Sequence, residues 1–140
     1  MQTKEVKEKI IKLGEKLKFD VHTEFGAVDS GWPDLVWFDN RIKLEHFEIE
    51  KPQSRGYTIP LIPFVGFELE GKSSAKGAKH IKGSIANIDS LSPLVGIIVV
   101  PTEAVDRVRR YVNDTKSKTR IVVLSEDQIE VWANKVCGTT

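Results

Sequence analysis

The sequence lacks the features that mark secreted and membrane proteins. Its 140 residues include a single cysteine, Cys137, so the chain cannot form an internal disulfide bond. No apolar stretch approaches the roughly 20 residues of a membrane-spanning helix. The polar start Met1-Gln2-Thr3-Lys4 is also unlike a signal peptide. We therefore expect a cytoplasmic protein without a membrane partner.

Repeats, low-complexity segments and an excess of one charge are also missing. The length suits one hydrophobic core and leaves no room for a second, so residues 1–140 are predicted to form a single domain. There are 21 lysines and arginines against 20 aspartates and glutamates, a net charge of +1. Such a balance permits a nucleic-acid partner only where basic residues gather locally. One gathering stands out, formed by Lys72, Lys76, Lys79 and Lys82.

Hydrophobic periodicity in the first half predicts one helix followed by strands. Apolar residues recur at helical spacing over Thr3–Leu17, and apolar and polar residues alternate over Lys18–Phe25. Residues 34–38 (DLVWF) and Arg41–Lys51 predict two more strands, separated by a turn at Asp39-Asn40. We expect the first two of these strands to form a hairpin.

The second half alternates strands and helices, which favours parallel pairing. After a proline-interrupted, irregular stretch over residues 52–63, a central strand is predicted within Pro63–Ser74. The elements expected next are a helix over 75–89, a buried strand over 94–100, a helix over 102–113, a strand over 120–124 and a last helix that starts with the capping box Ser125–Gln128. These elements predict an α/β domain with a mixed central sheet flanked by helices.

The central strand carries an ionisable face. In FELEGK, residues 67–72, two apolar side chains alternate with Glu68, Glu70 and Lys72, and alternate side chains of a strand point to opposite faces. A half-buried row of carboxylates repels itself unless an ammonium group or a divalent metal lies beside it. Another carboxylate stands at the start of an earlier strand, in Pro33-Asp34.

A strand opened by Pro33-Asp34, with a later strand closed by Glu70-Gly71-Lys72, resembles the PD-(D/E)XK nuclease superfamily. That superfamily includes restriction endonucleases and archaeal Holliday-junction resolvases. The resemblance covers roughly residues 3–100 and implies a restriction-endonuclease-like α-β-β-β-α-β core, here with a C-terminal α-β-α extension. It also implies a metal-dependent endonuclease that hydrolyses DNA, of restriction, repair or junction-resolving type.

By this resemblance, Asp34 and Glu70 bind Mg²⁺ or Mn²⁺, the carbonyl group of Gly71 is a further ligand, and Lys72 holds or polarises the attacking water. Hard oxygen ligands suit Mg²⁺, and phosphodiester hydrolysis needs a cation to activate water and to neutralise developing charge. Many members of the superfamily add a glutamate from the first helix. Two candidates lie opposite its apolar stripe, Glu8 and Glu15.

The helix after the central strand is the expected contact for nucleic acid. Basic and polar side chains near phosphates position the backbone without reading base sequence. The side chains available for this on the predicted polar face are Lys76, Lys79, His80 and Asn87. We expect double-stranded or branched DNA as the partner, and a homodimer because two strands must usually be cut.

Other interpretations of these residues stay open. FEIEK, residues 47–51, offers Glu48 and Glu50 as a rival acid pair, and His46 with them would be the ligand set of a zinc site. The alternative function is a catalytically inactive nuclease-fold protein that binds nucleic acid or a partner subunit. A third is an interaction domain whose acidic row is only a solvated surface.

Overall fold

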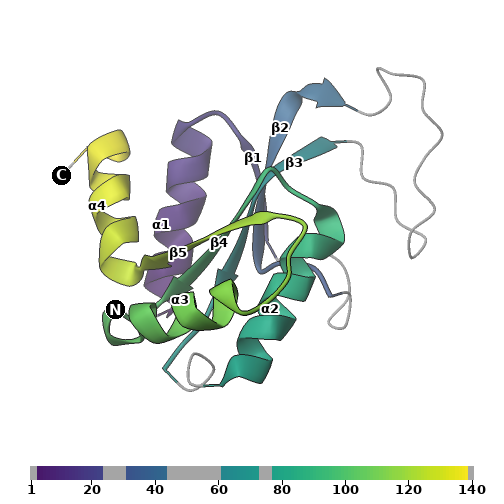
Figure 1. The fold of residues 1–140 in the computed structure, drawn as a ribbon. Helices are drawn as coiled ribbons and strands as arrows, with labels where there is room; N and C mark the ends of the chain where they lie inside the picture. Colours follow the sequence, from purple (N-terminus) through teal and green to yellow (C-terminus); the bar gives the residue numbers. More distant parts are fainter. Residues whose placement is uncertain (1–2, 24–30, 44–60, 73–76, 139–140) are drawn as a thin grey trace.

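A computed structural model of the chain describes residues 3–23, 31–43, 61–72 and 77–138 (Figure 1). The elements in chain order are α1 (Thr3–Lys16), β1 (Asp20–Thr23), β2 (Leu35–Lys43), β3 (Leu61–Leu69), α2 (Ala78–Leu91), β4 (Val95–Val100), the 3₁₀ helix η4 (Thr102–Ala104), α3 (Val105–Asn113), β5 (Arg120–Ser125) and α4 (Glu126–Cys137). The predicted α/β class is confirmed. Within these ranges, no helix has the length and apolar character needed to span a bilayer.

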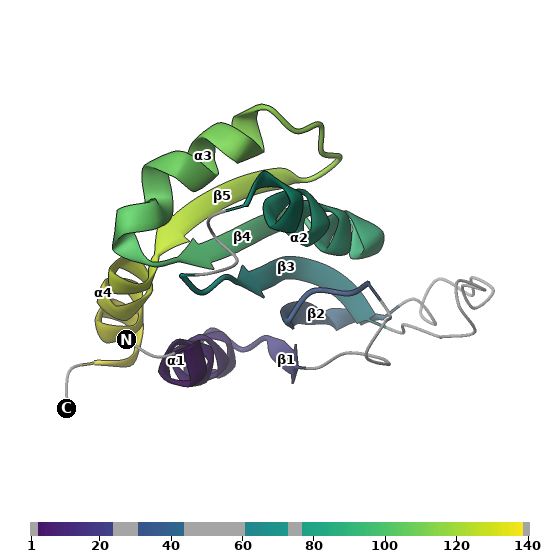
Figure 2. The ribbon, with the colours of Figure 1, turned by 90° about the horizontal axis from the view of Figure 1, so that it is seen from below.

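The five strands form one sheet in which they lie in chain order, from β1 to β5 (Figure 2). β1 pairs with β2 and β2 with β3 in antiparallel fashion, whereas β3–β4 and β4–β5 are parallel. The parallel pairing expected for the second half is therefore confirmed. β3 therefore pairs antiparallel with β2 and parallel with β4. Because β2 and β3 run in opposite directions, the carboxyl end of β3 lies beside the start of β2.

Two helices cover each face of the sheet. α1 and α4 lie side by side on one face (Figure 1), where Val6, Ile10 and Leu13 of α1 join the buried core. Trp37 is central to this core, with its ring 4.7 Å from that of Phe67. The second face carries α2 and α3, packed over a separate apolar cluster rich in isoleucine and valine.

One turn predicted from the sequence is wrong, because β2 continues through Asp39-Asn40 to Lys43. Asp39 pairs with Ile62 of β3, and its carboxylate accepts a 2.8 Å contact from the guanidinium of Arg41. Hydrogen bonds from the side chain and backbone of Arg41 lower the pKa of Asp39 to about 2. Asp39 thus lies in the strand although the Asp-Asn sequence favours a turn, and the pairing with β3 shifts in register between Asp39 and Lys43.

The predicted strand at Arg41–Lys51 is also changed. Residues 41–43 complete β2, and the remainder of that segment lies outside the described residues. The neighbour of β2 is β3, which begins at Leu61 and includes Pro63 opposite Phe38, beside a shift in register. A proline is tolerated within a strand at such an irregularity, which explains why part of the predicted irregular stretch is a strand.

Candidate active site

The carboxyl end of β3 places two acidic side chains against α2. Leu69 packs into the core beneath α1 and α4, so its neighbours Glu68 and Glu70 point to the other face. Glu68 is only 3% exposed, and its Oε1 accepts a 2.7 Å hydrogen bond from Nδ2 of Asn87. Oε1 of Glu70 accepts a hydrogen bond from the hydroxyl of Ser84. The predicted alternation is confirmed for Glu68 and Glu70, whose face meets a helix, but β3 ends at Leu69 and the alternation does not extend to Lys72.

Asp34 lies directly beside Glu68. Leu35 is opposite Phe67 in the antiparallel ladder, so the residue before Leu35 is level with the residue after Phe67. The backbone N–H of Asp34 donates to Oε2 of Glu68 at 3.1 Å, and Oδ2 of Asp34 accepts from the N–H of Leu69 at 2.9 Å. Residues 34 apart in the chain therefore form one carboxyl pair.

A glycine lets the start of β2 approach β3 closely. A Cβ added to Gly66 would lie 3.3 Å from Cγ of Pro93 and 3.4 Å from Cγ of Pro33. Those contacts are tighter than most packed carbons adopt, so the missing side chain leaves room for both prolines. Pro33 packs against β3 in this space. The next residue, Asp34, is thereby placed beside Glu68.

Burial is the main cause of an unusual protonation state at Glu68. Its pKa is raised to about 9, first by burial and then by the charge of Asp34 and the hydrogen bond between the two carboxyl groups. Hydrogen bonds from Asn87 and from the backbone of Asp34 act in the opposite direction. At neutral pH Glu68 thus keeps its proton. A cation beside the pair would favour loss of that proton, because opposite charge stabilises the ionised form.

The acid that contacts Asp34 is Glu68, whereas the second metal ligand predicted from the sequence is Glu70. Both residues share one strand face, and the register of β2 against β3 decides which is level with Asp34. Ser84 is a further site residue that the sequence did not reveal. The sequence feature that could have identified Ser84 is its position three residues before Asn87, because residues at that spacing lie on the same side of a helix.

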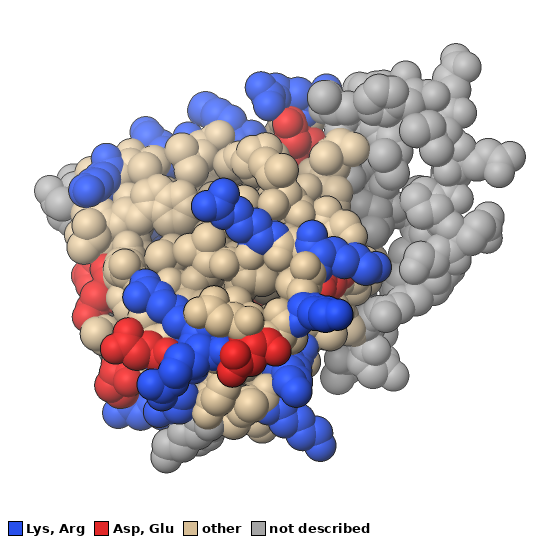
Figure 3. All heavy atoms as spheres, in the orientation of Figure 1, with Lys and Arg blue, Asp and Glu red and all other residues tan. Residues whose placement is uncertain are grey.

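The residues predicted to bind nucleic acid are divided by the structure. Lys79 and His80 are exposed on α2, while Asn87 turns to the sheet and donates to Glu68. Lys76 lies outside the described residues. Lysine and arginine side chains also occur on several other elements of the face shown in Figure 3, so they are not confined to α2.

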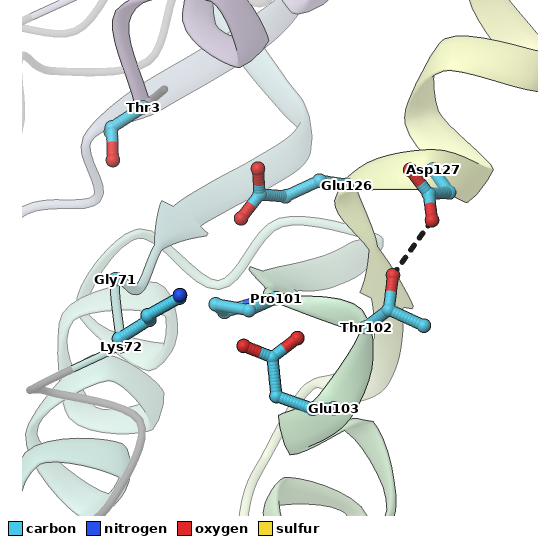
Figure 4. A pocket seen from close by; sticks show the side chains of 8 residues that line it. All are labelled: Thr3, Gly71, Lys72, Pro101, Thr102, Glu103, Glu126 and Asp127. Carbon is cyan, nitrogen blue, oxygen red and sulfur yellow. Dashed lines mark hydrogen bonds between the residues drawn. The ribbon is translucent and has the colours of Figure 1, made fainter. Parts of the chain in front are cut away.

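Lys72 lies in an open cavity at the same end of the sheet. This cavity, of about 670 Å³, is lined by Thr3, Gly71, Lys72, Pro101, Thr102, Glu103, Glu126 and Asp127. In Figure 4 the amino group of Lys72 points into the space, toward the side where Pro101 and the carboxylate of Glu103 lie. Oδ2 of Asp127 accepts a 2.9 Å hydrogen bond from Thr102 across the rim. The carboxyl ends of β3, β4 and β5 meet here, a common location for ligand sites in α/β sheets.

The two first-helix glutamates lie on the opposite face of the sheet from α2. Glu8 is exposed and lines a hollow between α1 and α4, and Glu15 is exposed near the end of α1. The rival residues His46, Glu48 and Glu50 lie outside the described residues.

The carboxyl pair offers oxygen ligands of the kind that Mg²⁺ prefers. This ion is commonly held by one or two carboxylates while it keeps several water ligands, and Asp34 with Glu68 fits that requirement. Larger groups, with three or more histidine, cysteine or acidic side chains placed to hold a metal ion, do not occur among the residues that the structure describes. A cation here would thus depend on the pair and on water.

Three comparisons of this chain, with protein-family models, with curated proteins and with solved structures, found no match. The function therefore has to be inferred from the residues and their geometry.

Proposed function

We propose that this chain is a divalent-metal-dependent endonuclease that hydrolyses DNA phosphodiester bonds on a restriction-endonuclease-like fold. The observation that carries the proposal is the carboxyl pair of Asp34 and Glu68. A buried acid whose pKa is raised first by burial and then by a second acid is unfavourable for folding, and strongly perturbed acids are concentrated at functional sites. The neighbouring Glu70 has the spacing from Glu68 that the PD-(D/E)XK motif gives its lysine.

This proposal gives a specific role to each of the protein groups near the carboxyl pair. Asp34 and Glu68 would hold Mg²⁺, which when bound lowers the pKa of a water molecule and neutralises charge on the phosphate. The N–H of Leu69 fixes the carboxylate of Asp34, and the amide of Asn87 fixes that of Glu68. Holding both acids in place before a cation arrives lowers the entropy lost on binding it.

Two residues are candidates for the group that activates the attacking water. Glu70 follows Glu68 on the same strand face, and its carboxylate is oriented by Ser84. Lys72 is the residue that the family motif favours, and it points into the cavity. Cleavage assays and Mg²⁺ titrations on Glu70→Gln and Lys72→Ala separate them, because loss of the group that activates water lowers the turnover rate without weakening metal affinity.

The central test is cleavage of DNA by the purified protein. We expect nicking of duplex or branched DNA in Mg²⁺ or Mn²⁺, none in chelator, and none with Asp34→Asn, whose fold is checked by circular dichroism. Absence of nicking on duplex, branched and single-stranded DNA with either metal would refute the enzyme claim.

A second candidate is a catalytically inactive protein of the same fold that binds DNA or a partner subunit. The observation that favours it is the position of Lys72, whose amino group points into the cavity while the amide and carboxyl groups at Asp34 and Glu68 pair with one another. Salt-sensitive DNA binding that needs no metal and gives no product would identify this function.

A further inference from the structure

α2 contains a glycine that the packing of the chain does not explain. Gly83 lies well inside this 14-residue helix, where glycine is the least favourable residue apart from proline. A glycine at such a position usually makes room for a close neighbour. A Cβ added to Gly83, however, would meet no atom of the described residues within 4 Å.

Two other glycines show what an internal reason looks like. Gly14 in α1 packs against the sheet, where an added Cβ would lie 2.4 Å from Nε1 of Trp37. Gly96 in β4 is also required by packing, since its Cβ would lie 2.6 Å from Cγ2 of Ile88. Gly83 is instead exposed, so the space beside it is open to a molecule outside the chain.

Gly83 lies on the side of α2 that borders the carboxyl pair. Asn87 follows it by four residues, so the two are about 40° apart around the helix axis. The amide of Asn87 donates to Glu68 of β3. Three residues further on, the hydroxyl of Ser90 donates to the carbonyl of Gly31 at 3.0 Å. This side of α2 therefore faces β3 and the segment just before β2.

Positive charge continues the same line toward the start of α2. Lys79 is exposed and precedes Gly83 by four residues, as Gly83 precedes Asn87, so the three residues follow one line along the helix. The first turn of α2 contains no acidic residue, and its N-cap residue, Gly77, has no side chain to cap the helix. N–H groups at a helix start and lysine side chains both attract negative charge. We call Lys79, Gly83 and Asn87 the α2 line.

We propose that the sugar-phosphate backbone of DNA lies along the α2 line and comes closest to the protein at Gly83. Lys79 would pair with one phosphate, the bare helix backbone at Gly83 would let the strand contact α2, and Asn87 is the end at which the strand meets the carboxyl pair. This inference rests on the proposed nuclease function, because it brings the substrate strand to the acids. None of these contacts is to a base edge, so binding should not depend on DNA sequence.

The first experiment measures binding of a short DNA duplex by fluorescence anisotropy, with and without Mg²⁺. The parent is the full chain with Asp34→Asn, which is not expected to cleave. Adding Gly83→Leu fills the space on the α2 line and should weaken binding at least about tenfold, whereas Gly83→Ala, with one methyl group, should weaken it about threefold. Alanine should also raise the melting temperature by about 3 °C, because it favours a helix. Weaker binding by a more stable protein excludes misfolding as the cause.

Asn134→Leu is the matched control for added bulk. Asn134 is exposed within α4, on the opposite face of the sheet from α2. The change places leucine, a better helix former than asparagine, at an exposed helical position without altering the charge. Its DNA affinity should equal that of the parent.

A second experiment tests the phosphate contact. Lys79→Ala should weaken binding equally for unrelated duplex sequences and reduce the slope of log affinity against log salt concentration by about one. Lys116→Ala is the matched control, because Lys116 is exposed in the segment before β5, at the amino ends of the parallel strands. It should leave that slope unaltered.

Failure of this inference and failure of the nuclease proposal give different results. If the unchanged chain cleaves DNA but Gly83→Leu binds like its parent, the inference is overturned and the nuclease proposal stands. If Gly83→Leu weakens binding but the unchanged chain cleaves nothing, the α2 line belongs to a DNA-binding protein without nuclease activity. Equal weakening by Asn134→Leu, or no DNA binding by the parent in either buffer, would also overturn the inference.

Discussion

Two polar regions lie at the same end of the sheet, and they differ in how far water reaches them. In the carboxyl pair, Glu68 is 3% exposed and its oxygens are held by Asn87 and Asp34. In the cavity, Lys72 and Glu103 are exposed and face open space (Figure 4). Both regions include residues at or just after the carboxyl end of β3, so strand position alone does not set their chemistry.

The comparison shows that burial gives the carboxyl pair its chemical character. A carboxyl group removed from water and placed beside another keeps its proton to a much higher pH. The same residue type in the cavity is hydrated, and charged neighbours there are screened by solvent. If the nuclease proposal is right, changes in the pair should have large effects and equivalent changes in the cavity small ones.

The largest expected effect is on metal-dependent cleavage. Glu68→Gln removes a metal ligand while keeping the size of the side chain, so we expect a loss of at least about 100-fold in the turnover rate. Glu103→Gln makes the same chemical change in the cavity and should alter the rate by less than about twofold. Rates are measured with a nicking assay in Mg²⁺. Equal losses in the two variants would place the active centre elsewhere.

The pH dependence of stability should follow Glu68. Its pKa in the folded chain is about 9, against an ordinary value of 4.5, so between these pH values the folded state holds a proton that the unfolded state has released. Stability contributed by that proton is complete below pH 4.5 and is lost as the pH rises toward 9. The slope should approach about 1.4 kcal/mol per pH unit in metal-free buffer.

Urea unfolding from pH 5 to pH 9 measures this slope. Glu68→Gln cannot ionise, so the variant should lose this part of the pH dependence. Glu103→Gln should retain it. A slope that is unchanged in Glu68→Gln would show that the carboxyl group does not stay protonated on folding.

Local sequence signals predicted the elements well. The capping box is confirmed, with N–H of Gln128 donating to Oγ of Ser125 at 3.1 Å and the side chain of Gln128 accepting from the backbone of Ser125. The buried strand β4 and the amphipathic α1 were also predicted close to their observed bounds. In each case the signal lies within a few consecutive residues and does not depend on a distant partner.

The composition of the carboxyl pair could not be predicted in the same way. Alternation assigned Glu68 and Glu70 to one face, but which of them is level with Asp34 depends on the register between β2 and β3. That register includes irregularities, one of them between Trp37 and Phe38, and it is set by contacts far apart in sequence. The wrong turn at Asp39-Asn40 also involves a distant strand, since Asp39 pairs with Ile62 of β3.

A smaller effect should come from the amide that supports the pair. Asn87→Ala removes the 2.7 Å donor to Oε1 of Glu68 and leaves a buried oxygen without it. We expect the free energy of unfolding to fall by about 1–3 kcal/mol. The hydrogen bond from Asn87 lowers the pKa of Glu68, so its loss should also raise that pKa further. Urea unfolding at pH 5 and pH 8 measures both changes.

The smallest effect is expected for the corresponding hydrogen bond of the cavity. Thr102→Val removes the hydroxyl that donates to Asp127 at 2.9 Å, but both residues are exposed. Water can replace the lost partner, so the free energy of unfolding should change by less than about 0.5 kcal/mol. A loss as large as that of Asn87→Ala would mean that the cavity is closed to water in solution. The contrast between the two regions would then rest on the identity of their charges and no longer on burial.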